Sequence, residues 1–429
     1  MNFRILTIEE TMEILNLFNE FEAENLEKKE PKISLLKSKN FVIYGAGSDF
    51  NSFRRNVLDP YNLIPFVIID KKFCKNHFFM TGPCHPDDFV LEDTDTDMVA
   101  VIALGNYHAR CEAYDYLEKA GFKTIISSHE IYEHFNISKD PELDKPDYYT
   151  SRRDVIKSSY QCLEDPLSKE VYVQFLKSFI TREYQPIPFD GEQIQYFPTD
   201  VPMSKSMKYW VNGGAYNGDT IDSLCENFPD KAKEVKMIWA FEPDMKNFLE
   251  LAESSVDSPK IKCMPFGLTN STEMKKFNSG NGKGSGLSTT GDSVMFVALD
   301  ELKLNMKPTF INMDIEGSEL SAVMGALKMI KKYKPDLAIC VYHHPGHIWS
   351  IIDLLNSMGV GYKFFLRNYT GFVVETVLYA TVIKDQAVDI QNEVSEWEED
   401  LVPIICEMED KECEVPVVVT SMEDEVKCE

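Results

Sequence analysis

Two short runs in the C-terminal half of the chain each end in side chains that could move a proton. Asp314 and Glu316 follow the apolar residues 309–313, and His343 comes shortly after the apolar residues 337–341. Both runs predict buried strands. Neighbouring parallel strands end at the same edge of a sheet, so we expect these three side chains to lie together. Two carboxylates and an imidazole could remove a proton from a reacting group, or equally bind a divalent metal ion.

A glycine-rich turn precedes these residues in the sequence. Residues 209–220 pass from strand-forming side chains through three glycines into a helix. Such a turn lets a ligand approach the backbone, although similar turns also occur where nothing binds. The next predicted strand, 237–241, ends at Glu242, where a carboxylate can accept both hydroxyls of a ribose. A helix-capping acid is the alternative for Glu242, but the two features at this spacing favour a cofactor site.

Taken together, these motifs resemble the FkbM family of S-adenosylmethionine-dependent methyltransferases over roughly residues 208–382. The motifs that carry the resemblance follow in the family's order: Asn212-x-Gly214-Ala215-x-x-Gly218-Asp219-Thr220, Phe241-Glu242-Pro243-Asp244, Leu299-Asp300, Asp314-Ile315-Glu316-Gly317-x-Glu319, Tyr342-His343 and Glu375-Thr376-x-Leu378-Tyr379-Ala380. The resemblance implies a doubly wound α/β sheet of the class I methyltransferase type, mostly parallel with an antiparallel last strand. S-adenosylmethionine would lie across the tips of its first two strands.

The resemblance also implies roles for individual residues. Catalysis would fall to Asp314 and His343, with Glu316 shaping the same edge and a metal ion left open. The cofactor would be held by Asn212, Gly214, Ala215, Gly218, Asp219, Thr220, Glu242, Asp244 and Phe266. The family usually has an acid at the end of the first strand, where this chain has Asn212. Because asparagine accepts a hydrogen bond but carries no charge, we expect it to hold the cofactor's amino end less tightly.

An earlier segment, residues 39–137, predicts a smaller Rossmann-like α/β domain. Its strand, Gly45-x-Gly47, helix, strand and Asp70 follow the order of a mononucleotide-binding unit. Phe50 stands where a third glycine would be expected, which disfavours a dinucleotide. A scaffold that binds no ligand is the alternative interpretation.

These assignments divide the chain into five segments. They are an N-terminal helix within 1–38, the small domain at 39–137, a linker and helical region at 138–207, the methyltransferase domain at 208–383 and an acidic tail at 384–429. The N-terminal helix is predicted at 7–28, and the helical part of the third segment at 151–183, with a break near Asp165. Within the methyltransferase domain we also expect a strand at 261–264, a glycine-rich loop over a substrate site at 279–286 and one continuous helix after Glu316. The N-terminal helix could serve packing or a homo-oligomer.

Charge and composition restrict the partners. The formal net charge is −26, and the tail alone contributes −13, which argues against a nucleic-acid partner. No run approaches the roughly 18 apolar residues of a membrane span, and the first residues do not resemble a secretory signal. The ten cysteines include no Cys-x-x-Cys pair, so we expect reduced thiols in a cytoplasmic protein.

The resemblance therefore implies an O-methyltransferase that modifies a hydroxyl of a sugar or glycan precursor, of the bacterial surface-polysaccharide type. A nucleotide-linked sugar is included among the acceptors. Two alternatives remain open: a non-catalytic scaffold of a glycan-assembly complex, and an NAD-dependent sugar oxidoreductase that uses residues 45–70.

Overall fold

The computed structural model describes residues 33–75, 82–91, 97–105, 107–131, 148–181, 187–279, 286–287 and 291–383. The predicted N-terminal helix at 7–28, residues 280–285 of the predicted glycine-rich loop and the acidic tail at 384–429 lie outside these residues. Among the described helices, none has both the length and the apolar character that a membrane span requires.

The N-terminal part forms a parallel sheet of five strands in the order β3-β2-β1-β4-β5. The strands are β1 (Phe41–Tyr44), β2 (Val67–Ile69), β3 (Gly82–Cys84), β4 (Val99–Ile102) and β5 (Thr124–Ser127). The helices are α2 (Ile33–Ser38), α3 (Ser48–Phe53) and α4 (Tyr107–Lys119). Asp70, the acid predicted to face a nucleotide, accepts hydrogen bonds from the backbone N–H groups of Ala46 at 2.7 Å and Lys72 at 2.8 Å. Its carboxylate therefore holds the glycine turn.

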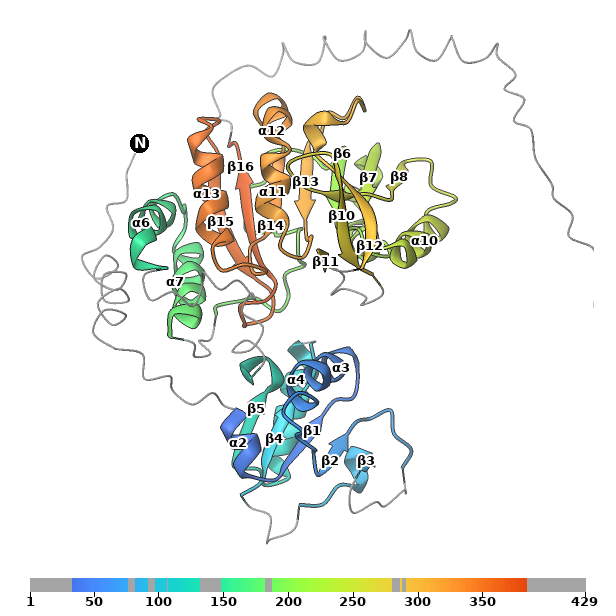
Figure 1. Ribbon diagram of the computed structural model, residues 1–429, viewed down its shortest axis with the longest axis vertical. Coiled ribbons are helices and arrows are strands. Elements are labelled where there is room, and N and C mark those ends of the chain that lie inside the picture. The colour runs from blue at the N-terminus through green and yellow to red at the C-terminus, as the bar shows by residue number, and fades with distance from the viewer. Residues whose placement is uncertain are drawn as a thin grey trace, which may run out of the picture. The chain divides into compact units, whose positions relative to one another are not determined.

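The C-terminal part contains a seven-stranded sheet in the order β15-β16-β14-β13-β6-β7-β8 (Figure 1). Its strands are β6 (Tyr209–Gly213), β7 (Met237–Phe241), β8 (Ile261–Met264), β13 (Phe310–Met313), β14 (Asp336–Cys340), β15 (Lys363–Asn368) and β16 (Thr376–Thr381). Strand β16 runs antiparallel to both of its neighbours, whereas β6, β7, β8, β13 and β14 are parallel. The predicted fold class and the antiparallel last strand are confirmed. Because β13 lies between β6 and β14, the carboxyl ends of all three meet.

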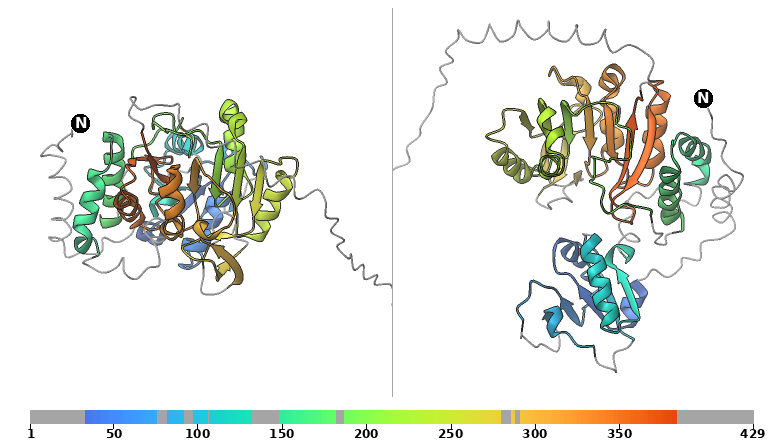
Figure 2. Two further views of the ribbon diagram at one scale, coloured as in Figure 1. Left: turned by 90° about the horizontal axis from the view of Figure 1, so that it is seen from above. Right: turned by 180° about the vertical axis from the view of Figure 1, so that it is seen from behind.

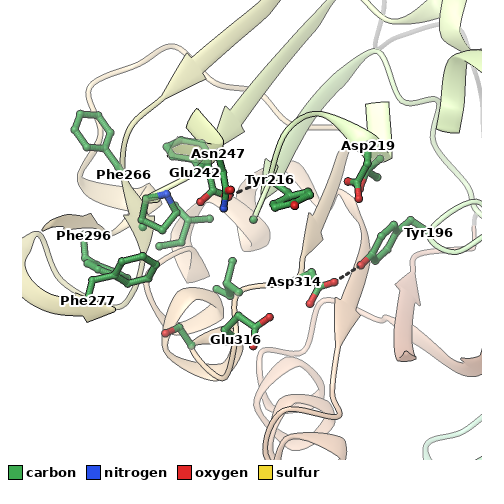
Figure 3. Close-up of a pocket in the computed structure, with 18 of the residues that line it drawn as sticks. Tyr196, Tyr216, Asp219, Glu242, Asn247, Phe266, Phe277, Phe296, Asp314 and Glu316 are labelled. Atoms are coloured by element: carbon green, nitrogen blue, oxygen red, sulfur yellow. Dashed lines mark hydrogen bonds between the residues drawn. The ribbon is translucent and has the colours of Figure 1, made fainter. Parts of the chain in front are cut away.

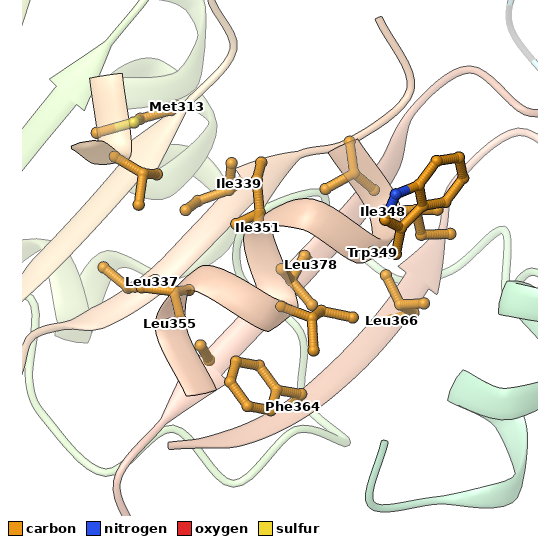
Figure 4. Packing of buried hydrophobic residues seen from close by; sticks show 14 of the residues in the cluster. Met313, Leu337, Ile339, Ile348, Trp349, Ile351, Leu355, Phe364, Leu366 and Leu378 are labelled. Atoms are coloured by element: carbon orange, nitrogen blue, oxygen red, sulfur yellow. The ribbon is translucent and has the colours of Figure 1, made fainter. Parts of the chain in front are cut away.

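Helices cover both faces of this sheet (Figures 1 and 2). They are α8 (Asp219–Asn227), α9 (Pro229–Glu234), α10 (Met245–Ser254), α11 (Glu319–Met324), α12 (Leu327–Tyr333) and α13 (His347–Ser357). Side chains alternate between the two faces along a strand, so successive residues of a strand pack in the hydrophobic cores on opposite faces of the sheet. Leu337 and Ile339 pack with Ile351 and Leu355 of α13 (Figure 4), whereas Ala338 belongs to the core on the other face.

The region between β8 and β13 differs from the sequence-based expectation. It forms a second, smaller sheet in the order β11-β10-β12-β9, from β9 (Gly267–Leu268), β10 (Glu273–Asn278), β11 (Gly286–Leu287) and β12 (Asp292–Val297). Strand β10 was missed because its exposed polar residues lack a clear apolar alternation. The helix predicted after Glu316 as one element is two, α11 and α12. Gly325 separates them, where a Cβ would lie 2.1 Å from the carbonyl oxygen of Thr269.

The helical region before the sheet consists of α6 (Arg153–Gln161) and α7 (Pro166–Thr181), which confirms the predicted break near Asp165. Arg367 on β15 is buried and donates to Asp165 at 2.8 Å and to Asp200 at 2.6 Å. The segment from 187 to 207 is thereby attached to the sheet. It also places Tyr196, whose backbone N–H donates to the hydroxyl of Tyr379 at 3.0 Å.

Candidate active site

A pocket opens at the carboxyl ends of the central strands of the seven-stranded sheet (Figure 3). The aromatic residues Phe266, Phe277 and Phe296 lie on one side of it, and Asp314 and Tyr196 lie on the other. Its lining comprises Gln195, Tyr196, Gly214, Tyr216, Asp219, Thr220, Phe241, Glu242, Pro243, Asn247, Phe266, Gly267, Leu268, Phe277, Phe296, Asp314, Ile315, Glu316, Ser318, Tyr342 and Glu375.

The glycine turn after β6 closely approaches the end of β13. Gly214 has a φ of +76°, and a Cβ at this position would lie 1.9 Å from the carbonyl oxygen of Asp314. Of the cofactor residues predicted in this turn, Gly214, Asp219 and Thr220 line the pocket. Ala215 is fully buried, and Gly218 is the left-handed residue that precedes α8, so both shape the turn from outside the lining.

Glu242, at the tip of β7, faces the pocket with its carboxylate held by backbone groups. It accepts hydrogen bonds from the N–H of Tyr216 at 2.9 Å and of Asp244 at 2.8 Å. Burial raises the pKa of Glu242 to about 7, and these two hydrogen bonds only partly oppose the effect. The capping role considered for Glu242 belongs to Asp244, which caps α10 by accepting from the N–H of Lys246 at 2.9 Å. Asp244 does not line the pocket.

Asn212 is fully buried in the sheet and also lies outside the pocket lining. Its Oδ1 accepts a hydrogen bond from Asn312 Nδ2 at 3.0 Å, and Asn312 Oδ1 accepts from Trp210 Nε1 at 2.6 Å. Asn212 Nδ2 has no hydrogen-bond partner among the described residues. Asn212 is therefore matched to a neutral amide on the neighbouring strand. An aspartate here would place a buried charge beside that amide, which is costly without a cation.

Asp314 is held by two tyrosine hydroxyls. Tyr196 donates to its Oδ2 at 2.8 Å, and Tyr342 donates to its Oδ1 at 3.3 Å. Burial and then the charge of Asp314 raise the pKa of both tyrosines well above the ordinary value, so both remain donors. Sequence reasoning did not assign a site role to Tyr196, which is far from Asp314 along the chain.

His343 and Glu316 lie next to Asp314, as predicted, but a further carboxylate orients the imidazole. Glu319, fully buried at the start of α11, lies 2.7 Å from His343 Nδ1. Glu319 Oε1 also accepts from the backbone N–H groups of Ile315 at 3.0 Å and Gly317 at 3.3 Å. His343 Nε2 is 3.5 Å from Asp314 Oδ1 and 3.6 Å from Glu316 Oε2. Asp314, Glu319 and His343 lie close enough to share a metal ion.

The charges of this cluster are strongly coupled. Burial opposes the charged form of His343, but Glu319, Glu316 and Asp314 outweigh it and raise its pKa to about 10. Burial likewise disfavours ionised Glu319, yet the two histidines beside it, His343 and His347, hold its pKa well below the usual range. Burial raises the pKa of Glu316 to about 7, with His343 opposing the shift. Glu319 was missed as a site residue because its position also fits the first turn of a helix.

Comparisons with known proteins bear on the domain and the fold. No curated protein matches the chain. The crystal structure of methyltransferase FkbM from Methylobacillus flagellatus KT is similar, with 19% sequence identity and a TM-score of 0.58 over 86% of this chain and 100% of that chain. A SAM-dependent methyltransferase from Aquifex aeolicus is more distant, at 13% identity and a TM-score of 0.25 over 42% and 84%. Residues 212–367 of this chain match the family model that is described as methyltransferase FkbM domain.

Proposed function

We propose that this methyltransferase transfers the methyl group of S-adenosylmethionine to a hydroxyl group of a sugar or glycan precursor. The observation that supports this proposal most is a single pocket with two chemically different ends. Glu242 and Gly214 border one part, and Asp314, with Tyr196 and Tyr342 bound to it, borders another. Methyl transfer requires a cofactor and an acceptor to meet in line.

The residues at the cofactor end suit S-adenosylmethionine, which supplies an electrophilic methyl group on a sulfonium. Glu242 can accept hydrogen bonds from both ribose hydroxyls, because its own backbone contacts leave lone pairs on each oxygen. The aromatic residues Phe266, Phe277 and Phe296 offer an apolar wall for a flat ring system. Asp219 supplies negative charge near the cationic part of the ligand.

At the acceptor end, Asp314 is the residue that we assign to take the hydroxyl proton. It lines the pocket, whereas His343 is outside the lining and is oriented by Glu319. General-base catalysis needs a group within hydrogen-bond reach of that proton. Gln195 and Glu375 border the same end and provide further acceptors for a molecule rich in hydroxyl groups. These acceptors support a sugar as the methylated molecule.

The proposal is tested by titration calorimetry with S-adenosylmethionine and with NAD, followed by mass spectrometry of neutral glycosides and nucleotide sugars incubated with labelled S-adenosylmethionine. We expect heat from S-adenosylmethionine alone and a labelled methyl ether on a sugar. Binding of NAD without binding of S-adenosylmethionine would contradict the proposal and favour an oxidoreductase. Transfer to an amine or a carboxylate instead of a hydroxyl would retain the cofactor but overturn the acceptor.

The affinity for S-adenosylmethionine should depend on the charge of Glu242. With a pKa of about 7, only about a tenth of the carboxyl is ionised at pH 6, against about nine tenths at pH 8. Because the carboxylate is the better acceptor for ribose hydroxyls, we expect binding to be about tenfold weaker at pH 6 than at pH 8. Calorimetry at both values measures this difference. The control is Glu242→Gln, which retains the titration of Glu316 and of the ligand, so the difference between the two proteins belongs to Glu242.

The stability of the cofactor-free protein should change in the opposite direction. The folded pKa of Glu242 is raised above that of the unfolded chain, so its contribution is fully present below about pH 4.5 and is lost as the pH rises through about 7. Between pH 6 and pH 8 the wild type should lose about 1.4 kcal/mol relative to Glu242→Gln. Denaturant unfolding of both proteins at the two pH values measures it, and parallel pH profiles would contradict it.

A further inference from the structure

The imidazole of His343 makes unusual contacts at the acceptor end of the pocket. Its side chain is about nine tenths buried, and no hydrogen bond joins its Nε2 to any residue that the structure describes. Nε2 instead lies between two carboxylates, 3.5 Å from Asp314 Oδ1 and 3.6 Å from Glu316 Oε2. These separations exceed the 2.7–3.2 Å of ordinary N–H···O hydrogen bonds. Direct hydrogen bonding therefore does not account for the arrangement.

The same separations suit ligands of a shared metal ion. Metal bonds to imidazole nitrogen or carboxylate oxygen are about 2.0–2.2 Å long. Two such ligands on one ion are therefore about 3.0 Å apart at a right angle and about 3.5 Å apart at a tetrahedral angle. The distance from His343 Nε2 to Asp314, 3.5 Å, matches the tetrahedral value, and that to Glu316, 3.6 Å, lies just above it. As placed, Asp314, Glu319 and His343 lie close enough to share an ion, and Glu316 must turn towards Asp314 to join them.

The contact between Glu319 and His343 provides a second observation. Histidines that bind a metal through one ring nitrogen usually donate a hydrogen bond from the N–H of the other nitrogen, often to a carboxylate. This hydrogen bond fixes the orientation of the ring and its tautomer. Glu319 is fully buried and lies 2.7 Å from His343 Nδ1, while two backbone N–H groups hold the same Glu319 oxygen. Its other oxygen lies 3.2 Å from His347 Nδ1. Glu319 is thus positioned to orient the histidine, with Nε2 turned towards Asp314 and Glu316.

We propose that Asp314, Glu316 and His343 bind a divalent metal ion, with Glu319 as the residue that orients His343. One imidazole and two carboxylates suit Mn²⁺ best, with Mg²⁺ as the harder alternative. Three carboxylates surround a single histidine here, and a divalent cation bound at Nε2 would replace the imidazole proton and balance their charge in its place. Asp314 would bind the ion through Oδ1, the oxygen nearer His343, which leaves Oδ2 to take the proton of an acceptor hydroxyl bound at an open position on the ion. That role rests on the proposed function, whereas the site itself does not.

The experiment is an electron paramagnetic resonance titration of the full chain with Mn²⁺, in the absence of S-adenosylmethionine. We expect one saturable site per chain. His343→Ala and Glu316→Gln should each weaken binding at least tenfold, and Glu319→Gln should weaken it by about 10-fold to 100-fold through loss of orientation. Asp219→Asn is the matched control, because it removes one negative charge from the same pocket outside the cluster. Its affinity for Mn²⁺ should stay within about twofold of wild type.

Two results would overturn the metal site. One is the lack of saturable Mn²⁺ binding by the wild type. The other is an equal loss in Asp219→Asn and Glu316→Gln, which would indicate diffuse attraction by negative charge. Calorimetry with S-adenosylmethionine in the presence of EDTA separates this proposal from the methyltransferase proposal. The methyltransferase proposal does not require the ion for cofactor binding, so S-adenosylmethionine should still bind when EDTA has removed the metal. Circular dichroism verifies that each variant is folded.

Discussion

Asp314→Asn should lower the rate of methyl transfer about 10³-fold and leave the affinity for S-adenosylmethionine within about twofold of wild type. The substitution keeps the size of the side chain but removes the carboxylate that we assign to take the proton. Tyr196 and Tyr342 donate to different oxygens of Asp314, so an amide would also present its NH₂ group to one of these two hydroxyls. Single-turnover rates with saturating cofactor measure the first effect, and titration calorimetry measures the second.

The control for this prediction is Asp300→Asn, an aspartate whose role is structural. Asp300 accepts from the backbone N–H groups of Lys328 and Met329, both at 2.8 Å, and so caps α12. The amide keeps only one of these two hydrogen bonds, so the substitution should lower stability by about 1 kcal/mol and leave the transfer rate unchanged. If Asp314→Asn instead loses the cofactor while its transfer rate at saturation is normal, Asp314 belongs to cofactor binding and the assignment is wrong.

Gly214→Ala should destabilise the methyltransferase domain by about 4 kcal/mol or more and abolish cofactor binding. Its added Cβ would lie 1.9 Å from the carbonyl oxygen of Asp314, far inside van der Waals contact, and both atoms belong to rigid backbone. The φ of +76° adds a cost of about 1 kcal/mol for any residue with a side chain. Relief requires β6 and β13 to move apart, which alters both ends of the pocket.

Gly359→Ala separates the two contributions. Gly359 also has a positive φ, of +65°, but a Cβ there would meet nothing within 4 Å. We expect this variant to lose only about 1 kcal/mol and to bind the cofactor normally. Denaturant unfolding followed by intrinsic fluorescence, together with calorimetry, compares the two variants. Equal losses of stability would show that backbone conformation, and not the contact with Asp314, makes Gly214 necessary.

Sequence patterns were sufficient for the strands of the central sheet. The bounds predicted for β7 and β8, 237–241 and 261–264, agree with the structure. The apolar run of β7 is buried at four of its five positions, so the run of apolar residues in the sequence directly indicates the buried strand. The same reasoning brought Asp314 and His343 together, because both follow strands that turned out to be neighbours. Exposed or interrupted elements carried a weaker pattern, and β10 and the break at Gly325 were missed.

What only the tertiary structure decided is how neighbouring polar residues divide their roles. Glu242 and Asp244 are two acids in one short motif, yet Glu242 faces the pocket and Asp244 caps α10. Asn212, which the sequence presents as a weakened cofactor ligand, pairs with Asn312 inside the sheet.

The sequence by itself determined where the strands and glycine turns of the seven-stranded sheet follow one another along the chain. Burial and backbone conformation restrict which residues are allowed at these positions. The partners of each polar side chain were decided by tertiary structure. The hydrogen bond from Tyr196 to Asp314 joins residues 118 positions apart in the sequence, and the hydrogen bond between Glu319 and His343 joins residues 24 positions apart. A hydrogen bond depends on distances of about 3 Å, and only the packed sheet and helices bring such distant residues that close.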